Sequence, residues 1–121
     1  MVGKEGKVLA CEADPKRYKL LSNRMDILGA AAIVESKLQN FFEINAGTMP
    51  WSKVTKIMLD PSCSGSGMAH RRILQEEDTE ERIENLAQFQ EKAIQKAMTF
   101  TNVAEISYST CSIHKRVINL P

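Results

Sequence analysis

The 121-residue sequence has few cysteines, no long apolar segment and little net charge. Its three cysteines, Cys11, Cys63 and Cys111, are odd in number and lack CxxC spacing, which argues against a disulfide framework and a zinc site. No apolar run approaches the roughly 20 residues that span a bilayer. Residues 1–7 lack the apolar core of a signal peptide. We therefore expect an intracellular protein in a reducing compartment, with no membrane span and no metal centre.

The charge balance excludes little by itself. Sixteen basic and 15 acidic residues leave a net charge of +1. This net charge does not by itself indicate nucleic-acid binding, although a local basic patch can still bind RNA. A chain that is 43% hydrophobic and 26% charged fits one globular domain rather than a disordered segment.

The first recognisable unit is a strand followed by a helix. The short apolar run Lys7–Glu12 is typical of a parallel strand covered on both faces. Asp14 suits a helix N-cap, with Pro15 at the first helical position, and Gly29 suits the position just past the helix end. Residues spaced three and four apart mark the buried face of this helix: Tyr18, Leu21, Met25 and Leu28.

Three more strands and a second helix follow. β-branched and apolar residues predict strands over Ala30–Glu35, Val54–Asp60 and Val103–Ser109. Gln39–Ile44 is a short extension or a helical turn, and Asn45–Ser52 a loop. Asp78 and Glu81 resemble a capping box. The second helix has an apolar face over about five turns, formed by Ile83, Leu86, Ala87, Ala93, Ile94, Ala97 and Met98. The order β-α-β-β-α-β predicts an α/β fold with a parallel sheet covered by helices.

Two cysteines follow predicted strands directly. Ile57–Leu59 leads into Asp60, Pro61, Ser62 and Cys63, and the last strand leads into Thr110 and Cys111. Strand ends are where open α/β sheets place ligands, so either cysteine is a candidate nucleophile. The residues alone leave open that both are small core residues, as we expect for Cys11. A hydrolase dyad of Cys111 and His114 lacks an orienting acid, and the Gly65–Gly67 loop lacks the lysine of a P-loop.

The roles of Glu12 and Arg17 are also left open by the sequence. An acid that ends an early strand can hydrogen-bond a ribose, but it can also simply favour the start of the next helix. Arg17 is by itself a surface charge.

The motifs DPSCSGSG at 60–67 and YSTCS at 108–112 together resemble the Nol/Nop/Sun family of RNA cytosine-5 methyltransferases. The serine after the proline is most similar to the eukaryotic subgroup that methylates large-subunit ribosomal RNA. The resemblance covers about residues 6–114 and implies a Rossmann-like fold that uses S-adenosylmethionine as the methyl donor. It also implies an RNA partner, a ribosomal RNA, and a location in the nucleus or nucleolus.

The resemblance also implies roles for individual residues. Cys111 matches the nucleophile that adds to cytosine C6, and Cys63 the second cysteine that assists release of the RNA adduct. Asp60 matches an acid that lies between the cofactor and the target base. Glu12 matches the acid that binds the cofactor ribose, and Arg17 a position near the cofactor. Asn40 stands where the family usually has an aspartate facing the adenine.

The chain also departs from the family pattern. Against that pattern we expect the first strand with its glycine-rich loop and the last strands to be missing. Residues 1–121 are then expected to form a partial catalytic domain, family-like over 6–114, with a divergent tail at 115–121. We therefore expect an incomplete Rossmann-like methyltransferase fold. The alternative function is a catalytically inactive α/β fragment that acts at most as a binding module.

Overall fold

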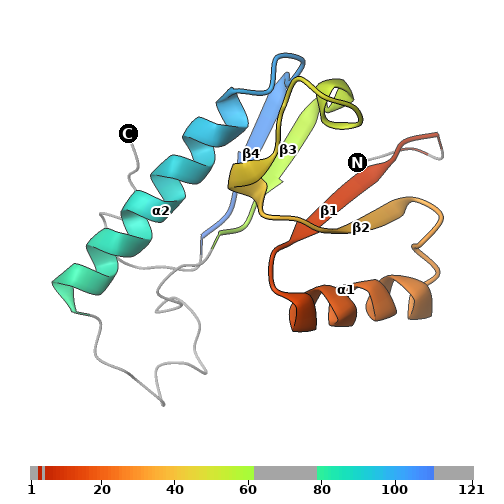
Figure 1. Cartoon of the computed structure of the whole chain (residues 1–121), viewed down its shortest axis with the longest axis horizontal. Coiled ribbons are helices and arrows are strands. Elements are labelled where there is room, and N and C mark those ends of the chain that lie inside the picture. The colour runs from red at the N-terminus through yellow and green to blue at the C-terminus, as the bar shows by residue number, and fades with distance from the viewer. Residues whose placement is uncertain (1–2, 4, 62–78, 111–121) are drawn as a thin grey trace. The chain divides into compact units, whose positions relative to one another are not determined.

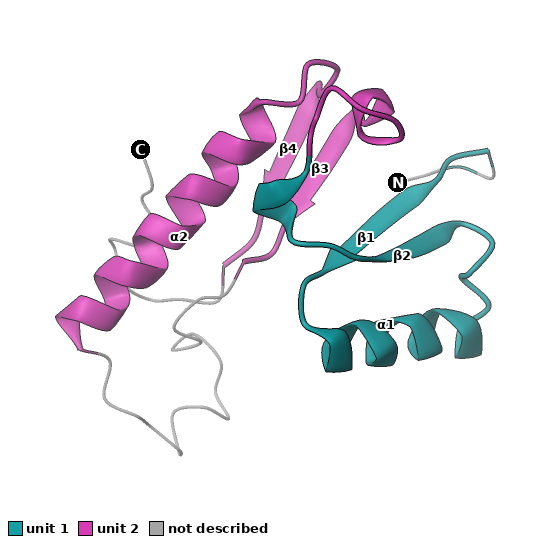
Figure 2. Cartoon of the chain, viewed as in Figure 1, with its two compact units in different colours: residues 1–44 teal, residues 45–121 magenta. Residues whose placement is uncertain are grey.

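The computed structural model describes residues 3, 5–61 and 79–110 (Figure 1). The chain divides into two compact units, residues 1–44 and residues 45–121 (Figure 2). Within the described ranges, neither helix combines the length and apolar character needed to cross a membrane.

The first unit is a strand–helix–strand arrangement. Strand β1 (Val8–Glu12) is followed by helix α1 (Pro15–Ile27) and strand β2 (Val34–Leu38), which pairs with β1 in parallel. Val8 lies opposite Val34, and Glu12 lies opposite Leu38. Helix α1 packs against both strands. The parallel pairing confirms the sequence prediction, although β1 is half-buried rather than fully covered.

Both ends of α1 follow the predicted chemistry. The Asp14 carboxylate accepts the backbone N–H of Arg17 at 2.8 Å, and Pro15 occupies the first turn. Beyond the helix, Gly29 adopts a φ of +68°, a left-handed conformation that costs glycine little. Its N–H donates to the carbonyl of Asp26, and the next N–H, of Ala30, donates to Met25. This pair of bonds is a Schellman motif, which satisfies two carbonyls at the helix end.

This cap explains why the predicted strand Ala30–Glu35 begins too early. The carbonyl of Ala30 accepts the N–H groups of Ile33 and Val34, so the chain turns before it can extend. The strand therefore starts at Val34. Leu28, expected on the buried face of the helix, is 73% exposed because it lies in the cap.

The second unit holds another parallel pair. Strand β3 (Lys56–Leu59) pairs with strand β4 (Glu105–Tyr108), and helix α2 (Glu80–Met98) connects them in sequence and packs on β3. A short 3-10 helix occurs at Phe41–Glu43 in the first unit, and another at Trp51–Lys53 in the second. The described strands thus form two separate two-stranded sheets, where the sequence predicted one sheet.

Side chains of β3 and β4 alternate between two environments. Leu59 is buried and Ile57, Ile106 and Tyr108 are half-buried, whereas Met58 is 83% exposed. One face of this sheet is therefore open among the described residues, whereas the sequence predicted a parallel sheet covered by helices.

The buried face of α2 is narrower than predicted. Its fully buried positions are Ala87, Gln90, Ala93 and Ala97. Small side chains let the helix approach the sheet closely. Met98, predicted on this face, is 71% exposed at the last helical position.

The N-terminus of α2 is capped by Thr79, whose hydroxyl accepts the N–H of Arg82 at 3.2 Å. The capping residue expected from the sequence, Asp78, lies outside the described residues.

Candidate functional site

The carboxyl ends of β1 and β2 lie at one edge of the first unit. The N–H of Gln39 donates to the carbonyl of Glu12 at 3.0 Å, which extends the ladder one step beyond the paired residues Glu12 and Leu38. Glu12 and Asn40, which the sequence places far apart, therefore follow neighbouring strands to the same edge.

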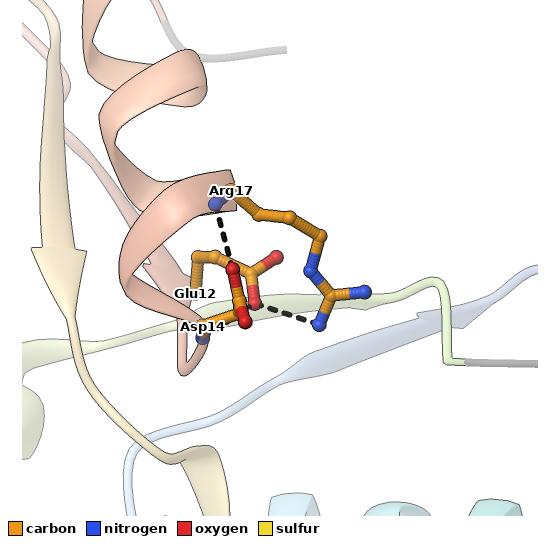
Figure 3. A network of polar contacts seen from close by, with 3 residues as sticks. All are labelled: Glu12, Asp14 and Arg17. Carbon is orange, nitrogen blue, oxygen red and sulfur yellow. Dashed lines mark hydrogen bonds and ion pairs between the residues drawn. The ribbon is translucent and has the colours of Figure 1, made fainter.

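Glu12 is held by two donors at this edge (Figure 3). Its Oε1 accepts the backbone N–H of Asp14 and a guanidinium N–H of Arg17, both at 2.9 Å. The Glu12 side chain is 24% exposed and that of Arg17 is 69% exposed, so the acid is partly enclosed while the base lies at the surface. Within the described part of the chain, both of these hydrogen bonds to the carboxylate are accepted by Oε1. Its Oε2 is the oxygen available to accept hydrogen bonds from a ligand hydroxyl.

Asn40 lies at the surface as the N-cap of a short 3-10 helix. Its Oδ1 accepts the N–H of Phe42 at 3.0 Å. The amide nitrogen can therefore donate outward while the oxygen is engaged locally. An amide at this position can donate a hydrogen bond to an acceptor nitrogen in the ring of a ligand.

The second unit presents a comparable edge. Leu59 lies opposite Tyr108, and the N–H of Ser109 donates to the Leu59 carbonyl at 2.9 Å. Asp60, which is exposed, and Thr110, which is half-buried, thus leave the sheet at the same end. The two motifs identified in the sequence begin at the same end of the sheet, although Tyr108 lies 48 positions after Asp60 in the chain.

The two candidate nucleophiles, Cys63 and Cys111, lie outside the described residues. Cys11 lies within β1, where it is half-buried, and burial raises the pKa of its thiol while the charge of Lys37 partly opposes this. A half-buried thiol in a strand, with its pKa raised by burial, agrees with the structural role expected for Cys11. In the described part of the chain, no three metal-ligating side chains gather in a group.

Sequence reasoning missed Gln90. It is fully buried on α2, and its Oε1 accepts a hydrogen bond from the hydroxyl of Tyr108. Burial raises the pKa of the Tyr108 phenol, and a hydrogen bond from the Thr110 side chain, which favours the phenolate, acts in the opposite direction. The helical spacing from Ala87 through Gln90 to Ala93 was the available signal, but a polar residue type obscured it.

A shallow depression of about 450 Å³ runs along the first half of α2. Its walls include Arg82, Leu86 and Phe89. None of the predicted site residues that the structure describes lines it.

Comparisons with known proteins place these observations in context. The model of the family described as 16S rRNA methyltransferase RsmB/F matches residues 1–117. The 25S rRNA (cytosine-C(5))-methyltransferase NSUN5 of Arabidopsis thaliana is 36% identical over 92% of this chain and 21% of the relative. The 25S rRNA (cytosine-C(5))-methyltransferase rcm1 of Schizosaccharomyces pombe is 37% identical over 89% of this chain and 25% of the relative.

A third relative, the 28S rRNA (cytosine-C(5))-methyltransferase of Mus musculus, is 33% identical over 90% of this chain and 24% of the relative. The chain thus spans about a quarter or less of the length of these three proteins. The crystal structure of PH0851 is similar in fold, with a TM-score of 0.73 and 24% identity over 93% of this chain and 25% of that chain. That likeness confirms the predicted fold class.

Proposed function

The chain belongs to the 16S rRNA methyltransferase RsmB/F family, and from this premise we propose that it takes part in methylating cytosine C5 in large-subunit ribosomal RNA. One observation carries the proposal: Asp60 and the Tyr108–Thr110 segment leave the same end of the β3–β4 sheet. Each leads within a few residues into a cysteine, Cys63 or Cys111. The names of the relatives, which are large-subunit rRNA methyltransferases, support this substrate. A nuclear or nucleolar location is part of the same proposal.

The first unit suits the nucleoside part of S-adenosylmethionine. Glu12 ends a parallel strand, and its Oε1 is fixed by Asp14 and Arg17, which leaves Oε2 to accept ribose hydroxyls. Asn40, at the end of the neighbouring strand, is the candidate for the adenine. Arg17 acts by orienting Glu12. When bound, S-adenosylmethionine supplies an electrophilic methyl group.

The second unit supplies the residues that activate the base. In our proposal the Cys111 thiolate adds to C6 of cytosine, forming an S–C6 bond, and the electron pair of the C5–C6 double bond makes C5 nucleophilic. Asp60 hydrogen-bonds the base during this addition. C5 would then bond the methyl group that bound S-adenosylmethionine supplies, as the bond from that carbon to the cofactor sulfur breaks. Loss of the C5 proton to a base returns an electron pair to the ring, which expels the Cys111 thiolate, and Cys63 assists this release.

Binding and transfer are tested in order on the purified chain. Calorimetry with S-adenosylmethionine tests the first unit, and we expect saturable binding. Incubation with large-subunit rRNA and methyl-labelled cofactor tests the second unit, and we expect label in 5-methylcytosine.

The matched variants are Cys111→Ala, which should abolish transfer, and Cys11→Ala, which should retain it because that thiol lies within β1. Equal transfer by Cys111→Ala would contradict the assigned nucleophile. A chain that is folded by circular dichroism but neither binds the cofactor nor transfers the methyl group would establish the alternative, an inactive α/β fragment.

A further inference from the structure

Helix α1 has an exposed side that is rich in positive charge. The helix packs on β1 and β2 (Figure 2), and its half-buried residues are spaced three and four apart along one side: Tyr18, Leu21, Ser22 and Met25. The opposite side has the same helical spacing, and every residue on it is exposed: Lys16, Lys19, Leu20, Asn23, Arg24 and Ile27. We call these six residues the basic face of α1.

The net charge of the chain conceals this concentration of positive charge. Helix α1 contains four basic residues and one acidic residue, whereas α2 contains three basic and four acidic residues. Three of the four bases of α1, namely Lys16, Lys19 and Arg24, belong to the basic face, and its single acid, Asp26, does not. A chain with a net charge of +1 therefore carries a local basic patch on one helix.

The cations of the basic face form no ion pair among the described residues. The other described cations of the first unit do form ion pairs, since Lys7 and Lys37 contact the Glu35 carboxylate and Arg17 contacts Glu12. The acids of the first unit that are held in ion pairs are thus used away from the basic face. The positive charges on this face remain available to an anion that approaches from solvent.

This arrangement of charge does not favour the helix itself. Lys16 lies in the first turn, which contains no acidic residue, and there the positive end of the helix dipole opposes a cation. Lys16 and Lys19 are neighbours on the helix surface, so their charges repel each other. The first turn of α2 instead contains Glu80 and Glu81. Arg24, in the last turn of α1, does suit the dipole, but helix stability does not account for the two lysines.

The spacing of the cations suits an anion with several charges. Lys16 and Arg24 are eight positions apart, which corresponds to about 12 Å along a helix axis, and Lys19 lies between them. A nucleic-acid strand carries a phosphate for about every 3.4 Å of duplex axis, so more than one phosphate can contact the face. Asn23 adds an amide that can donate a hydrogen bond to a phosphate or sugar oxygen.

The apolar residues of the basic face do not form a membrane-binding side. A helix that lies on a membrane separates its apolar side from its basic side. In α1 the two kinds of residue share one side, because Leu20, which is 51% exposed, is four positions from both Lys16 and Arg24. The mixture of charged, amide and apolar side chains favours RNA over a lipid surface.

We propose that the basic face of α1 binds the phosphate backbone of the RNA substrate without regard to its sequence. The inference rests on the proposed function, because that function makes RNA the substrate. Contacts to phosphates supply affinity and fix the register of the bound strand, whereas contacts to bases select the target.

The experiment measures the binding of fluorescein-labelled oligouridylate to the purified chain by fluorescence anisotropy, over a series of KCl concentrations. This RNA contains no cytosine, so the assay depends on neither cofactor nor methyl transfer. The test variant is Lys16→Gln/Lys19→Gln/Arg24→Gln. Glutamine has a helix propensity close to that of lysine and arginine, so the charges are removed while α1 is retained.

The matched control is Lys53→Gln/Lys56→Gln/Lys92→Gln, which removes the same number of positive charges from exposed positions of the second unit. We expect the slope of log K against log salt to become shallower by about 2 in the test variant, since each phosphate contact of a single strand contributes about 0.7. The control should keep the slope of the parent chain.

The proposal is overturned if the parent chain does not bind the RNA, or if the test variant and the control change the slope equally. It is also overturned if the test variant loses binding to phosphatidylserine vesicles and keeps that to RNA, because the face would then be a membrane contact. If the test variant loses helix content by circular dichroism, Lys16→Glu decides the question. A glutamate suits the first turn of a helix, so this variant should stay folded and bind RNA more weakly. Unchanged affinity would overturn the proposal.

Failure of this inference and failure of the proposed function give different results. A chain that binds RNA through the basic face but transfers no methyl group would support the inference and count against the proposed function. A chain that methylates ribosomal RNA, and whose test variant binds RNA as the parent chain does, would overturn the inference alone.

Discussion

The guanidinium of Arg17 donates to the same oxygen of Glu12 that accepts the backbone N–H of Asp14, each at 2.9 Å. The strand end and the first turn of the helix thereby fix the carboxylate together (Figure 3). The sequence left two roles open for Glu12, a helix-start acid and a ribose ligand. The geometry is compatible with both, because the helix-start contacts use Oε1 and leave Oε2 for the proposed ribose.

Glu12→Gln should weaken binding of S-adenosylmethionine by about tenfold or more, because hydrogen bonds to a charged acceptor contribute more than neutral ones. Glu43→Gln is the control, an exposed acid in the short 3-10 helix of the same unit. Calorimetry measures both. Equal affinities for Glu12→Gln and the parent chain would remove Glu12 from the cofactor site.

Gly29→Ala should destabilise the chain by about 1 kcal/mol, the cost of a left-handed conformation for a residue with a Cβ. The cost is conformational, because an added Cβ would meet no atom within 4 Å at this position. Gly29→Asn should cost less, since asparagine tolerates this region better.

Urea unfolding of the Gly29 variants gives the free energies, with Gly47→Ala as the control at a glycine without a positive φ. A loss for Gly47→Ala as large as that for Gly29→Ala would show that the backbone conformation is not the cause.

The same helix end shows what the sequence could and could not predict. The limits of α1 are predicted by local residue preferences at Asp14, Pro15 and Gly29. All three predictions are confirmed. The predicted start of β2, at Ala30, was wrong. The hydrogen bonds of the helix cap continue into a turn at the carbonyl of Ala30, and β-branched Ile33 does not indicate this turn. Local residue preferences predict the presence of a helix cap, but they do not predict how many following residues its hydrogen bonds include.

The candidate sites show a related division. The strand end at Glu12 was evident from a short apolar run and the strand end at Asp60 from a motif. The structure brings Asp60 and Tyr108 to one edge, as parallel pairing requires. Gln90 could not be found from residue type, because its hydrogen bond with Tyr108 crosses the helix–sheet contact and follows from the folded structure, not from local sequence.

Acid should destabilise the first unit through Glu35. Hydrogen bonds from Lys37 and then Lys7 lower the pKa of this carboxyl from 4.5 to about 2. The unfolded chain therefore binds the proton more tightly than the folded chain, so the contribution of Glu35 is complete above pH 4.5 and is lost as the pH falls toward 2.

Urea unfolding across this pH range should show a shallower decline for Glu35→Gln than for the parent chain. Because the group is at the surface, added salt should reduce the difference. Identical pH profiles at low salt would show that the two lysines do not hold the carboxylate in solution.

Cys63→Ala should convert a transient intermediate into a stable one. If Cys63 assists the expulsion of the Cys111 thiolate, its removal leaves the S–C6 bond intact, and a covalent protein–RNA species should accumulate when the chain is incubated with cofactor and ribosomal RNA. Denaturing gels resolve this species by its reduced mobility.

The double variant Cys63→Ala/Cys111→Ala should form no covalent protein–RNA species, because the sulfur that bonds to C6 is gone. Cys11→Ala should behave as the parent chain does, since its thiol lies within β1. An adduct that persists in the double variant would assign the nucleophile elsewhere, whereas an active parent whose Cys63→Ala variant turns over without an adduct would reassign Cys63 alone.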